Sequence, residues 1–371
     1  RAGAQGQHRE HPSVSAQIEL WHSPNDGRDT FSLTPFLRWD RRDEERSHWD
    51  LRELSWVHVR GGMELRTGWR QVFWGVTEGV HLVDIINQTD AVESVDGERK
   101  LGQPMLNLAL EQGDHMFDLF LLIGARERTF PGAEGRLRLP IVVDRAQTRW
   151  ESRRADERLD LAARWQWNAY PLRLGLSGFS GHAREPELLP LASAAGVVLA
   201  PYYPLIHQVG VDAQITQGDL LWKLELIQRW GGREDYQAAD AGLEYTQVGI
   251  LDTPADLGWL LELLYDSRGR AASTPFQQDL LLGWRLAFND AASTTLLASV
   301  ILDPDSGEQL WSLEGQHRLA DAWSLGLELR QIGGTPAPQQ AEDFLLAADA
   351  RHALRPLARD SFVRTTLSWF F

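Results

Sequence analysis

The sequence predicts an all-β protein, a single transmembrane, antiparallel, up-and-down β-barrel of about 16 strands, within a range of about 14 to 18. Three observations predict this fold. Apolar residues recur at every second position in one segment after another, short and long connections alternate, and the 371 residues include 16 Trp. Two-residue periodicity places oily side chains on one face of a strand and polar side chains on the other. Trp is enriched where a protein meets a membrane surface.

The segment 159–169 illustrates the pattern, because Leu161 and Trp165 alternate with Asp160 and Arg164. A barrel strand of this kind turns its apolar face to lipid and its polar face to the lumen. About seventeen segments qualify as strands. In chain order they are Val14–Trp21, Phe31–Asp40, Trp49–Arg60, Glu64–Phe73, Met105–Glu111, Phe117–Ile123, Leu159–Ala169, Leu172–Ser177, Val209–Ile215, Leu220–Trp230, Gly242–Val248, Leu257–Asp266, Leu280–Phe288, Thr295–Leu302, Leu310–Arg318, Trp323–Arg330 and Asp360–Phe371.

The connections between these segments alternate in length. Turns such as Gly61-Gly62, Gln112–Asp114 and Gln217–Asp219 contain only a few residues, with Gly or Asp at the corners. Longer stretches lie between them, at 75–104, 124–157, 179–205, 267–276 and 332–359. This parity is typical of short periplasmic turns and long extracellular loops. A soluble sandwich or propeller has no reason to keep it.

The domain organisation expected from this pattern is simple. Residues 1–13 form a flexible N-terminal tail, and residues 14–371 form one barrel domain. Two interpretations of the loop 75–104 stay open: it folds inward as a constriction, or it is a solvated surface loop. The loop 179–205 contains the apolar run Leu188–Ile206, whose prolines make a membrane helix a poor interpretation. Such a loop at the pore mouth leaves a hydrophobic, lipid-like cargo as an alternative.

Composition excludes several other classes. The chain has no Cys, and its net charge is −15, which argues against a nucleic-acid partner. The motifs of serine hydrolases, zinc helices and phosphate-binding loops are missing, so we expect no cofactor, no metal and no enzyme activity. A mean hydropathy of −0.33 is too polar for a helical membrane protein, but a barrel tolerates it.

The terminal segment is the most specific local signal. Leu367, Trp369 and Phe371 share one face of a strand that stops on an aromatic residue. This segment resembles the last strand of outer-membrane barrels, which the barrel-assembly machinery reads as its signal. We therefore expect the outer membrane of a Gram-negative bacterium. A chain that begins at Arg1 without Met fits a signal peptide that was removed or not included.

A wider resemblance rests on Leu65–Gly75 (LRTGWRQVFWG), Trp222–Glu225 and Gly242–Thr246, together with the terminal strand. With these segments the chain resembles the uncharacterised proteobacterial porins related to alginate-export-type barrels. The resemblance implies the fold and the location more than a substrate. Alginate-export barrels are expected to line their pores densely with positive charge, whereas this chain mixes both signs along its strands, which argues against an acidic polysaccharide as cargo.

Charged residues on the inward face would set the selectivity of a pore. The pore-lining candidates are Arg38, Glu64, Arg66, Arg70, Asp84, Asp90, Arg164, Lys223, Glu225, Glu244, Glu262, Arg285, Glu328 and Arg330. Inward folding of the loop 75–104 would place its carboxylates opposite Arg66 and Arg70. The structural alternative is that opposite charges pair between neighbouring strands and only hold the wall together.

The sequence thus predicts a channel that passes a solute through a charged lumen, either as a passive porin or as the outer-membrane exit of an export system. One rival is a barrel hydrolase acting on lipid, with His58, His115, His207 or His317 as its base. Another is a soluble carbohydrate-active β-protein that stacks sugars on Trp. The expected partners are outer-membrane lipids and lipopolysaccharide, the barrel-assembly machinery, an unknown solute and, for an export exit, periplasmic or inner-membrane components.

Overall fold

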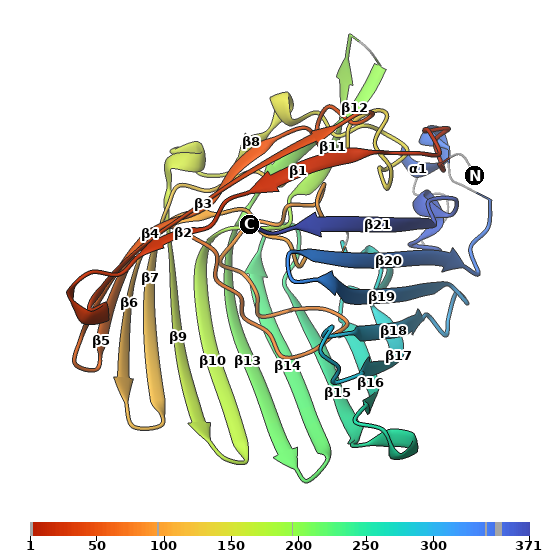
Figure 1. Ribbon diagram of the computed structural model, residues 1–371. Coiled ribbons are helices and arrows are strands. Elements are labelled where there is room, and N and C mark those ends of the chain that lie inside the picture. The colour runs from red at the N-terminus through yellow and green to blue at the C-terminus, as the bar shows by residue number, and fades with distance from the viewer. Residues whose placement is uncertain (1–2, 95, 195, 338–339, 346–350) are drawn as a thin grey trace.

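The computed structural model describes residues 3–94, 96–194, 196–337, 340–345 and 351–371. One sheet of 18 strands forms the body of the molecule (Figure 1). Its first half comprises β1 (Ser13–Gln17), β2 (Leu20–His22), β3 (Asp29–Asp40), β4 (Trp49–Arg60), β5 (Met63–Arg70), β6 (Gln103–Gln112), β7 (His115–Ile123), β9 (Leu159–Ala169) and β10 (Leu172–His182). Its second half comprises β13 (Leu205–Gln217), β14 (Leu220–Gly231), β15 (Tyr236–Gln247), β16 (Asp256–Asp266), β17 (Gln278–Ala287), β18 (Thr295–Leu302), β19 (Gln309–Ala320), β20 (Trp323–Gly333) and β21 (Phe362–Trp369).

Three further strands form a small second sheet. They are β8 (Arg149–Trp150), β11 (Glu187–Ser193) and β12 (Gly196–Tyr203), and the β11–β12 hairpin projects beyond the rim of the large sheet (Figure 1). The helical content is slight: α1 (Ala341–Leu345) and single 3-10 turns at Asn25–Gly27, Arg145–Gln147, Ala155–Glu157, Ile250–Asp252, Gly269–Ala271 and Arg355–Leu357. None of the described helices has the length and apolar character needed to cross a bilayer.

Each strand of the large sheet pairs antiparallel with the next one along the chain, from β3 to β21, apart from β8, β11 and β12. At its start, β1 and β2 lie end to end along the same side of β3. The predicted up-and-down barrel topology is confirmed, and the 18 strands fall at the upper end of the expected range. The predicted strand Val14–Trp21 is divided in two at Ile18 and Glu19, because Ile18 lies opposite Pro35 of β3, which has no backbone N–H to donate.

The sheet curls until its two ends approach each other. Glu93, in the connection between β5 and β6, accepts hydrogen bonds from Arg38 on β3 through its carboxylate, at 2.5 and 2.7 Å. The backbone carbonyl of the same residue accepts from Arg364 on β21, at 3.1 Å. Beyond the strands, Ala4 N–H donates to Asp360 just before β21. One internal residue therefore joins the first and last parts of the wall.

The outward face carries the apolar rows. On β16 this row runs Trp259, Leu261, Leu263 and Tyr265, with aromatic rings at both ends and leucines between them. The backbone register places Tyr245 beside Trp259 and Trp259 beside Trp284, so that three aromatic residues on neighbouring strands lie at one height near the short turns. Apolar bands flanked by aromatic girdles are typical of barrels that sit in a membrane.

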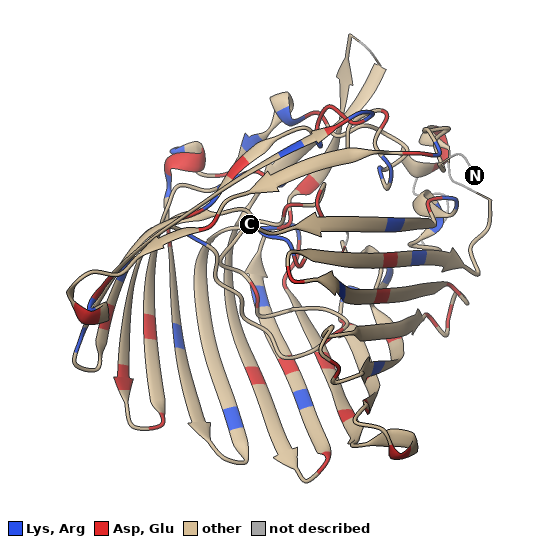
Figure 2. Cartoon of the chain, viewed as in Figure 1, with Lys and Arg blue, Asp and Glu red and all other residues tan. Residues whose placement is uncertain are grey.

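The inward face is charged and well packed. Acidic and basic positions are interspersed along the strands (Figure 2). Buried charged residues on the strands include Arg52, Asp118, Asp160, Arg164, Asp212, Glu225, Asp240 and Glu262. An apolar cluster lies among them, where Val83 and Ile86 of the β5–β6 connection contact Phe120, Leu122 and Ile227 of the wall. The hydrophobic core of this protein therefore lies inside the barrel, where the β5–β6 connection packs against the inner face of the wall.

Candidate functional site

The described residues of the connection from β5 to β6, 71–94 and 96–102, cross the interior of the barrel, and we call them the inward segment (Figure 1). Its Val83 and Ile86 are 0% exposed, and Trp74 packs edge-on against Phe120 at a ring distance of 5.6 Å. The backbone oxygen of Ile86 accepts a hydrogen bond from Arg184, and that of Leu82 from Gln208. A surface loop would not bury its apolar residues in this way. The segment is part of the folded interior.

Three carboxylates of the wall hold the inward segment through its backbone, and we call Glu225, Asp240 and Glu262 the latch. They come from the adjacent strands β14, β15 and β16. Glu225 accepts from Val76 N at 2.6 Å and from Thr77 N at 3.2 Å.

Further bonds complete these contacts. They run to Glu225 from Thr77 Oγ1 at 2.9 Å and Val83 N at 3.1 Å, to Glu262 from Glu78 N at 2.9 Å and Gly79 N at 2.7 Å, and to Asp240 from Val80 N at 3.4 Å. Five consecutive backbone amides, those of residues 76–80, therefore donate to carboxylates. Backbone N–H groups that point at one anionic site form the kind of concavity that favours negative charge.

The part of the inward segment that lies toward the long loops, which we call the loop end, is held by ion pairs. Asp90 accepts from Arg52 at 2.7 Å and contacts His48 at 3.3 Å. Burial disfavours the charged imidazole, but the hydrogen bonds with Asp90 and with the Arg46 carbonyl, together with the negative charges of Asp90 and Glu93, outweigh burial and raise the pKa of His48. Burial also opposes the ionised form of Asp90, yet His48 and Arg52 together lower the pKa of this carboxyl. Asp90 therefore forms buried ionic contacts with Arg52 and His48, and these contacts anchor the inward segment to the wall.

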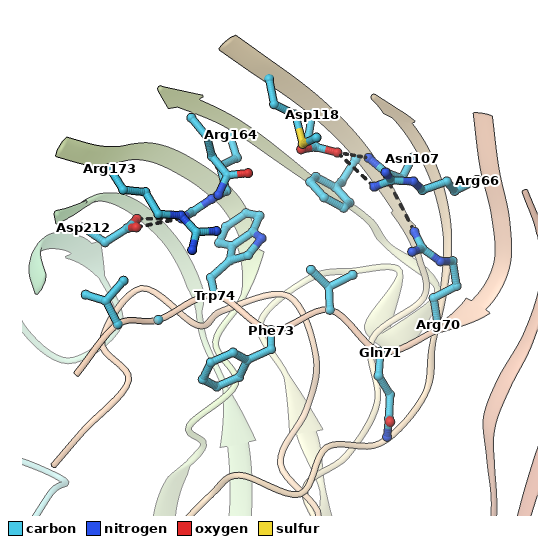
Figure 3. Close-up of a pocket in the computed structure, with 16 residues that line it drawn as sticks. Arg66, Arg70, Gln71, Phe73, Trp74, Asn107, Asp118, Arg164, Arg173 and Asp212 are labelled. Carbon is cyan, nitrogen blue, oxygen red and sulfur yellow. Dashed lines mark hydrogen bonds and ion pairs between the residues drawn. The ribbon is translucent and has the colours of Figure 1, made fainter. Parts of the chain in front are cut away.

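A cavity of about 280 Å³ lies on the other side of the inward segment, toward the short turns, and we call it the turn-side pocket (Figure 3). Its wall contributes four arginines, Arg66, Arg70, Arg164 and Arg173, but only two carboxylates, Asp118 and Asp212. The inward segment contributes Gln71, Phe73 and Trp74. The local charge is thus positive in a chain whose net charge is −15. Figure 3 shows Arg164 and Arg173 beside Trp74, with Arg66 and Arg70 across the pocket.

The pairing in this pocket is uneven. Arg164 donates to Asp212 at 2.8 Å, and its guanidinium lies 5.0 Å from the centre of the Trp74 ring. Arg66 contacts Glu64 at 2.5 Å and Asp118 at 3.5 Å.

The other two arginines of the pocket lack a carboxylate. Arg70 donates only to the amide of Asn107, at 3.2 Å, and the side chain of Arg173 makes no hydrogen bond or ion pair with any described residue. Two guanidinium groups therefore face the pocket with no carboxylate at ion-pair distance in the described part of the chain.

A glycine makes room for the Arg164–Asp212 pair. A Cβ atom on Gly175 would lie 2.6 Å from Arg164 Nη2 and closer still to Asp212, so one of these side chains would have to shift. Gly175 pairs with Asp212 across the β10–β13 ladder, so the clash is built into the register. Substitution here must displace one member of the ion pair.

We therefore expect Gly175→Ala to lower the free energy of unfolding by about 1 to 3 kcal/mol, the usual cost of overpacking. Gly178→Ala is the matched control, because it lies on the same strand and a Cβ atom there meets nothing within 4 Å. Urea unfolding in lipid vesicles measures both variants. Equal stabilities of the two variants would contradict the packing around Gly175.

The predicted pore-lining residues fall into pairs and clusters. Glu225 and Glu262 belong to the latch, and Lys223, Glu244 and Arg285 form a chain of contacts beside it. Arg285 also reaches Glu78 of the inward segment at 2.6 Å. Arg330 contacts Asp96, Glu314 and Glu328, and Glu328 also contacts Arg364. Asp84 pairs with Lys100, Asp90 with Arg52, Arg38 with Glu93 and Arg66 with Glu64.

One expected pairing is not found. The carboxylates of the inward segment were expected opposite Arg66 and Arg70, but the carboxylate that reaches Arg66 from across the sheet is Asp118 of β7. Asp84, Asp90 and Glu93 turn instead to basic residues at the loop end. The reason is that the segment runs past the turn-side pocket with its apolar side chains, such as Trp74, before its acidic residues begin.

Sequence reasoning missed Asp240, the third member of the latch. Its signal was present, because Asp240 has the same parity as Glu244 and therefore the same inward face of β15. Arg52 and Asp118 were missed in the same way. The apolar residues at the C-terminal end point outward: Leu367, Trp369 and Phe371 are exposed. The Trp369 ring lies 5.2 Å from that of Phe371 and 6.4 Å from that of Trp323.

Three of the four histidines proposed as a hydrolase base have other partners. His58 contacts Asp29 at 2.8 Å, His115 accepts from the indole of Trp165 at 3.2 Å, and His317 contacts the hydroxyl of Thr294 at 2.8 Å. No described serine lies within hydrogen-bond distance of these three rings. The geometry around them is that of wall residues.

No family model matches the sequence, and no curated protein matches it. Among solved structures, the chain is similar to Wzi, an outer membrane protein involved in group 1 capsule assembly in Escherichia coli and a carbohydrate-binding β-barrel. The TM-score is 0.54 at 11% identity, over 86% of this chain and 74% of that chain.

Two porins give weaker overlays. A BenF-like porin from Pseudomonas fluorescens gives a TM-score of 0.47 at 9% identity over 86% of both chains. OccK2 (OpdF) of Pseudomonas aeruginosa, in complex with glucuronate, gives 0.48 at 12% identity over 86% of this chain and 85% of that chain. A specific relation to alginate-export barrels stays a prediction. What the likeness to Wzi establishes is the architecture, and the chain has the fold of an outer-membrane β-barrel.

Proposed function

We propose that this chain is an outer-membrane channel of the porin class, whose charged lumen is kept narrow by the inward segment. The observation that carries the proposal is the latch: wall carboxylates hold the backbone of residues 76–80 inside a polar lumen. The outward apolar rows supply the membrane-facing belt, and backbone groups that pair between strands need no water from the bilayer. Selectivity then comes from the charges beside the constriction.

The same proposal covers location and partners. The apolar belt contacts outer-membrane lipids and lipopolysaccharide, and the exposed residues of β21 are available to the barrel-assembly machinery during insertion. As the exit of an export system, the barrel would meet its periplasmic component at the turn end, which is where the turn-side pocket lies. The rim hairpin β11–β12, with Leu189 and Val197 exposed, is the element that a hydrophobic cargo would contact first.

Planar bilayer recording tests this function. The full chain is expected to give discrete current steps, and a variant in which residues 75–86 are replaced by a short Gly-Ser linker is expected to give larger ones. Heat-dependent mobility on a gel verifies that both proteins are folded barrels. Folded protein that inserts but gives no current step with either chain would refute a channel.

A further inference from the structure

The structure assigns a ligand site to the turn-side pocket: we infer that it binds the oxyanion group of a small polar solute, and that this ligand holds the inward segment in place. The inference names the solute class of the proposed channel and in that sense rests on it. The binding itself needs no conductance. Guanidinium groups in the pocket have unfilled hydrogen-bonding positions, and the pocket is lined by both the wall and the inward segment. These observations support the inference.

Arg164 is the first of these observations. The residue is only 6% exposed, yet its Nε and Nη1 have no hydrogen-bond partner among the described residues. A buried guanidinium that uses one of its nitrogens and leaves the others unmet is costly unless something binds there. Arg164 lines the pocket, and an oxyanion accepting from these atoms would complete its hydrogen bonding.

Arg173 and Arg70 supply the second observation. Arg173 follows the turn into β10, is exposed toward the pocket, and has no side-chain partner among the described residues. Arg70, at the end of β5, has only the neutral amide of Asn107. With Arg164 they surround the pocket from three strands, whereas Asp212 neutralises only one of them. Planar, multidentate donors of this kind suit carboxylate and phosphate oxygens.

The pocket is built jointly by the wall and by the inward segment. The Trp74 ring supports the Arg164 guanidinium at 5.0 Å, and Trp74 N–H is tied to Asp84 further along the same segment, at 3.2 Å. A ligand that needs Arg164 in its present position therefore also needs the inward segment in its present position. By linkage, the ligand favours the narrowed state as much as that state favours the ligand.

Isothermal titration calorimetry on the detergent-solubilised barrel tests the site, with galacturonate, galactose and inorganic phosphate as probes. We expect galacturonate to bind and galactose not to bind. Arg173→Gln is expected to weaken galacturonate binding by about 10- to 100-fold, the loss of one charge-assisted hydrogen bond. Arg318→Gln is the matched control, an exposed inward arginine at the turn end of β19 that is far from the pocket in the ladder order. It should bind like the unaltered chain.

Phosphate binding shows whether the pocket accepts oxyanions other than carboxylates. Phosphate binding that Arg173→Gln weakens supports an oxyanion site, and phosphate binding that both variants weaken equally overturns it in favour of diffuse charge. Equal affinity for galactose and galacturonate also overturns it. Coupling is tested with Glu225→Ala, which loosens the inward segment at Val76 although the Glu225 side chain does not itself line the pocket. The affinity for galacturonate should fall, and an unchanged affinity in a folded variant would refute the shared site.

The two proposals fail separately. A barrel that binds galacturonate through Arg173 but never conducts keeps the site and loses the channel. A barrel that conducts but shows no anion binding keeps the channel and loses the site.

Discussion

The double variant Glu225→Ala, Glu262→Ala is expected to release the inward segment and shift its equilibrium toward an open lumen by on the order of 100-fold. Hydrogen bonds to a charged acceptor contribute about 1.5 to 3 kcal/mol each. Even one such bond lost per carboxylate totals about 3 kcal/mol, which corresponds to about two powers of ten. Glu225 alone accepts four hydrogen bonds from the segment. The measurement is the open probability of single channels in a planar bilayer.

Glu244→Ala provides the matched control. Glu244 also faces the lumen from β15, but its partners are Lys223 and Arg285 of the wall rather than the backbone of the inward segment. Its loss should leave the open probability close to that of the unaltered chain. An equal opening by Glu244→Ala would mean that lumen charge, and not the latch, sets the conductance. No opening in the double variant would mean that apolar packing around Val83 and Ile86 is sufficient to hold the segment.

Thiol labelling gives an independent reading of the same equilibrium. The chain contains no Cys, so a single cysteine introduced at Phe73 is the only thiol in the molecule. Phe73 belongs to the inward segment and is 54% exposed, and its ring packs against His81 at 4.8 Å. In the latch variant, a maleimide too large to enter the narrowed lumen should react faster at this position than it does in the protein with an intact latch.

The fold could be predicted from the sequence because two-residue periodicity fixes the face to which each side chain turns. If the row of Leu257, Trp259, Leu261 and Leu263 faced the lumen, Glu262 would face lipid, so the sequence alone assigns this row to the outer face. The same rule placed Glu225 and Glu244 inward before any contact was known. Where a segment was broken, as at Ile18 and Glu19 between β1 and β2, the pattern continued and hid the break. Periodicity reports faces and not hydrogen bonds.

The partners of the charged residues could not be predicted, because they depend on register and on the path of the inward segment. Glu225 lies about 150 residues from its donor Val76, a contact that no local pattern encodes. The sequence showed an even mixture of charges along the wall. The structure pairs most acids with arginines or backbone amides, and it leaves Arg70 and Arg173 in one pocket with no carboxylate in contact with either guanidinium. A lumen with acidic and basic residues in mixture can therefore contain a local pocket with an excess of positive charge.

Placing a charge in the apolar belt is the second large effect. Leu263 lies between Trp259 and Tyr265 on the outward face of β16 and is 59% exposed. Leu263→Arg is expected to lower the free energy of unfolding by about 2 to 4 kcal/mol when the barrel is in a bilayer, the cost of an arginine near the midplane. Val248→Arg is the control, because Val248 is 74% exposed in the β15–β16 connection, beyond the aromatic row. Near the interface, the cost falls to about 0 to 1 kcal/mol.

Urea unfolding in lipid vesicles, followed by Trp fluorescence, measures both variants. The comparison distinguishes a lipid-facing surface from a water-facing surface, because the two surfaces predict different losses of stability for the same arginine. On a water-exposed surface, an arginine in place of an exposed leucine changes stability by only about 0.5 kcal/mol in either direction. In acyl chains it has no water to solvate its charge, so the cost must depend on its depth. If Leu263→Arg were as harmless as Val248→Arg, the leucine rows would face water, and neither a membrane belt nor a channel could be built on them.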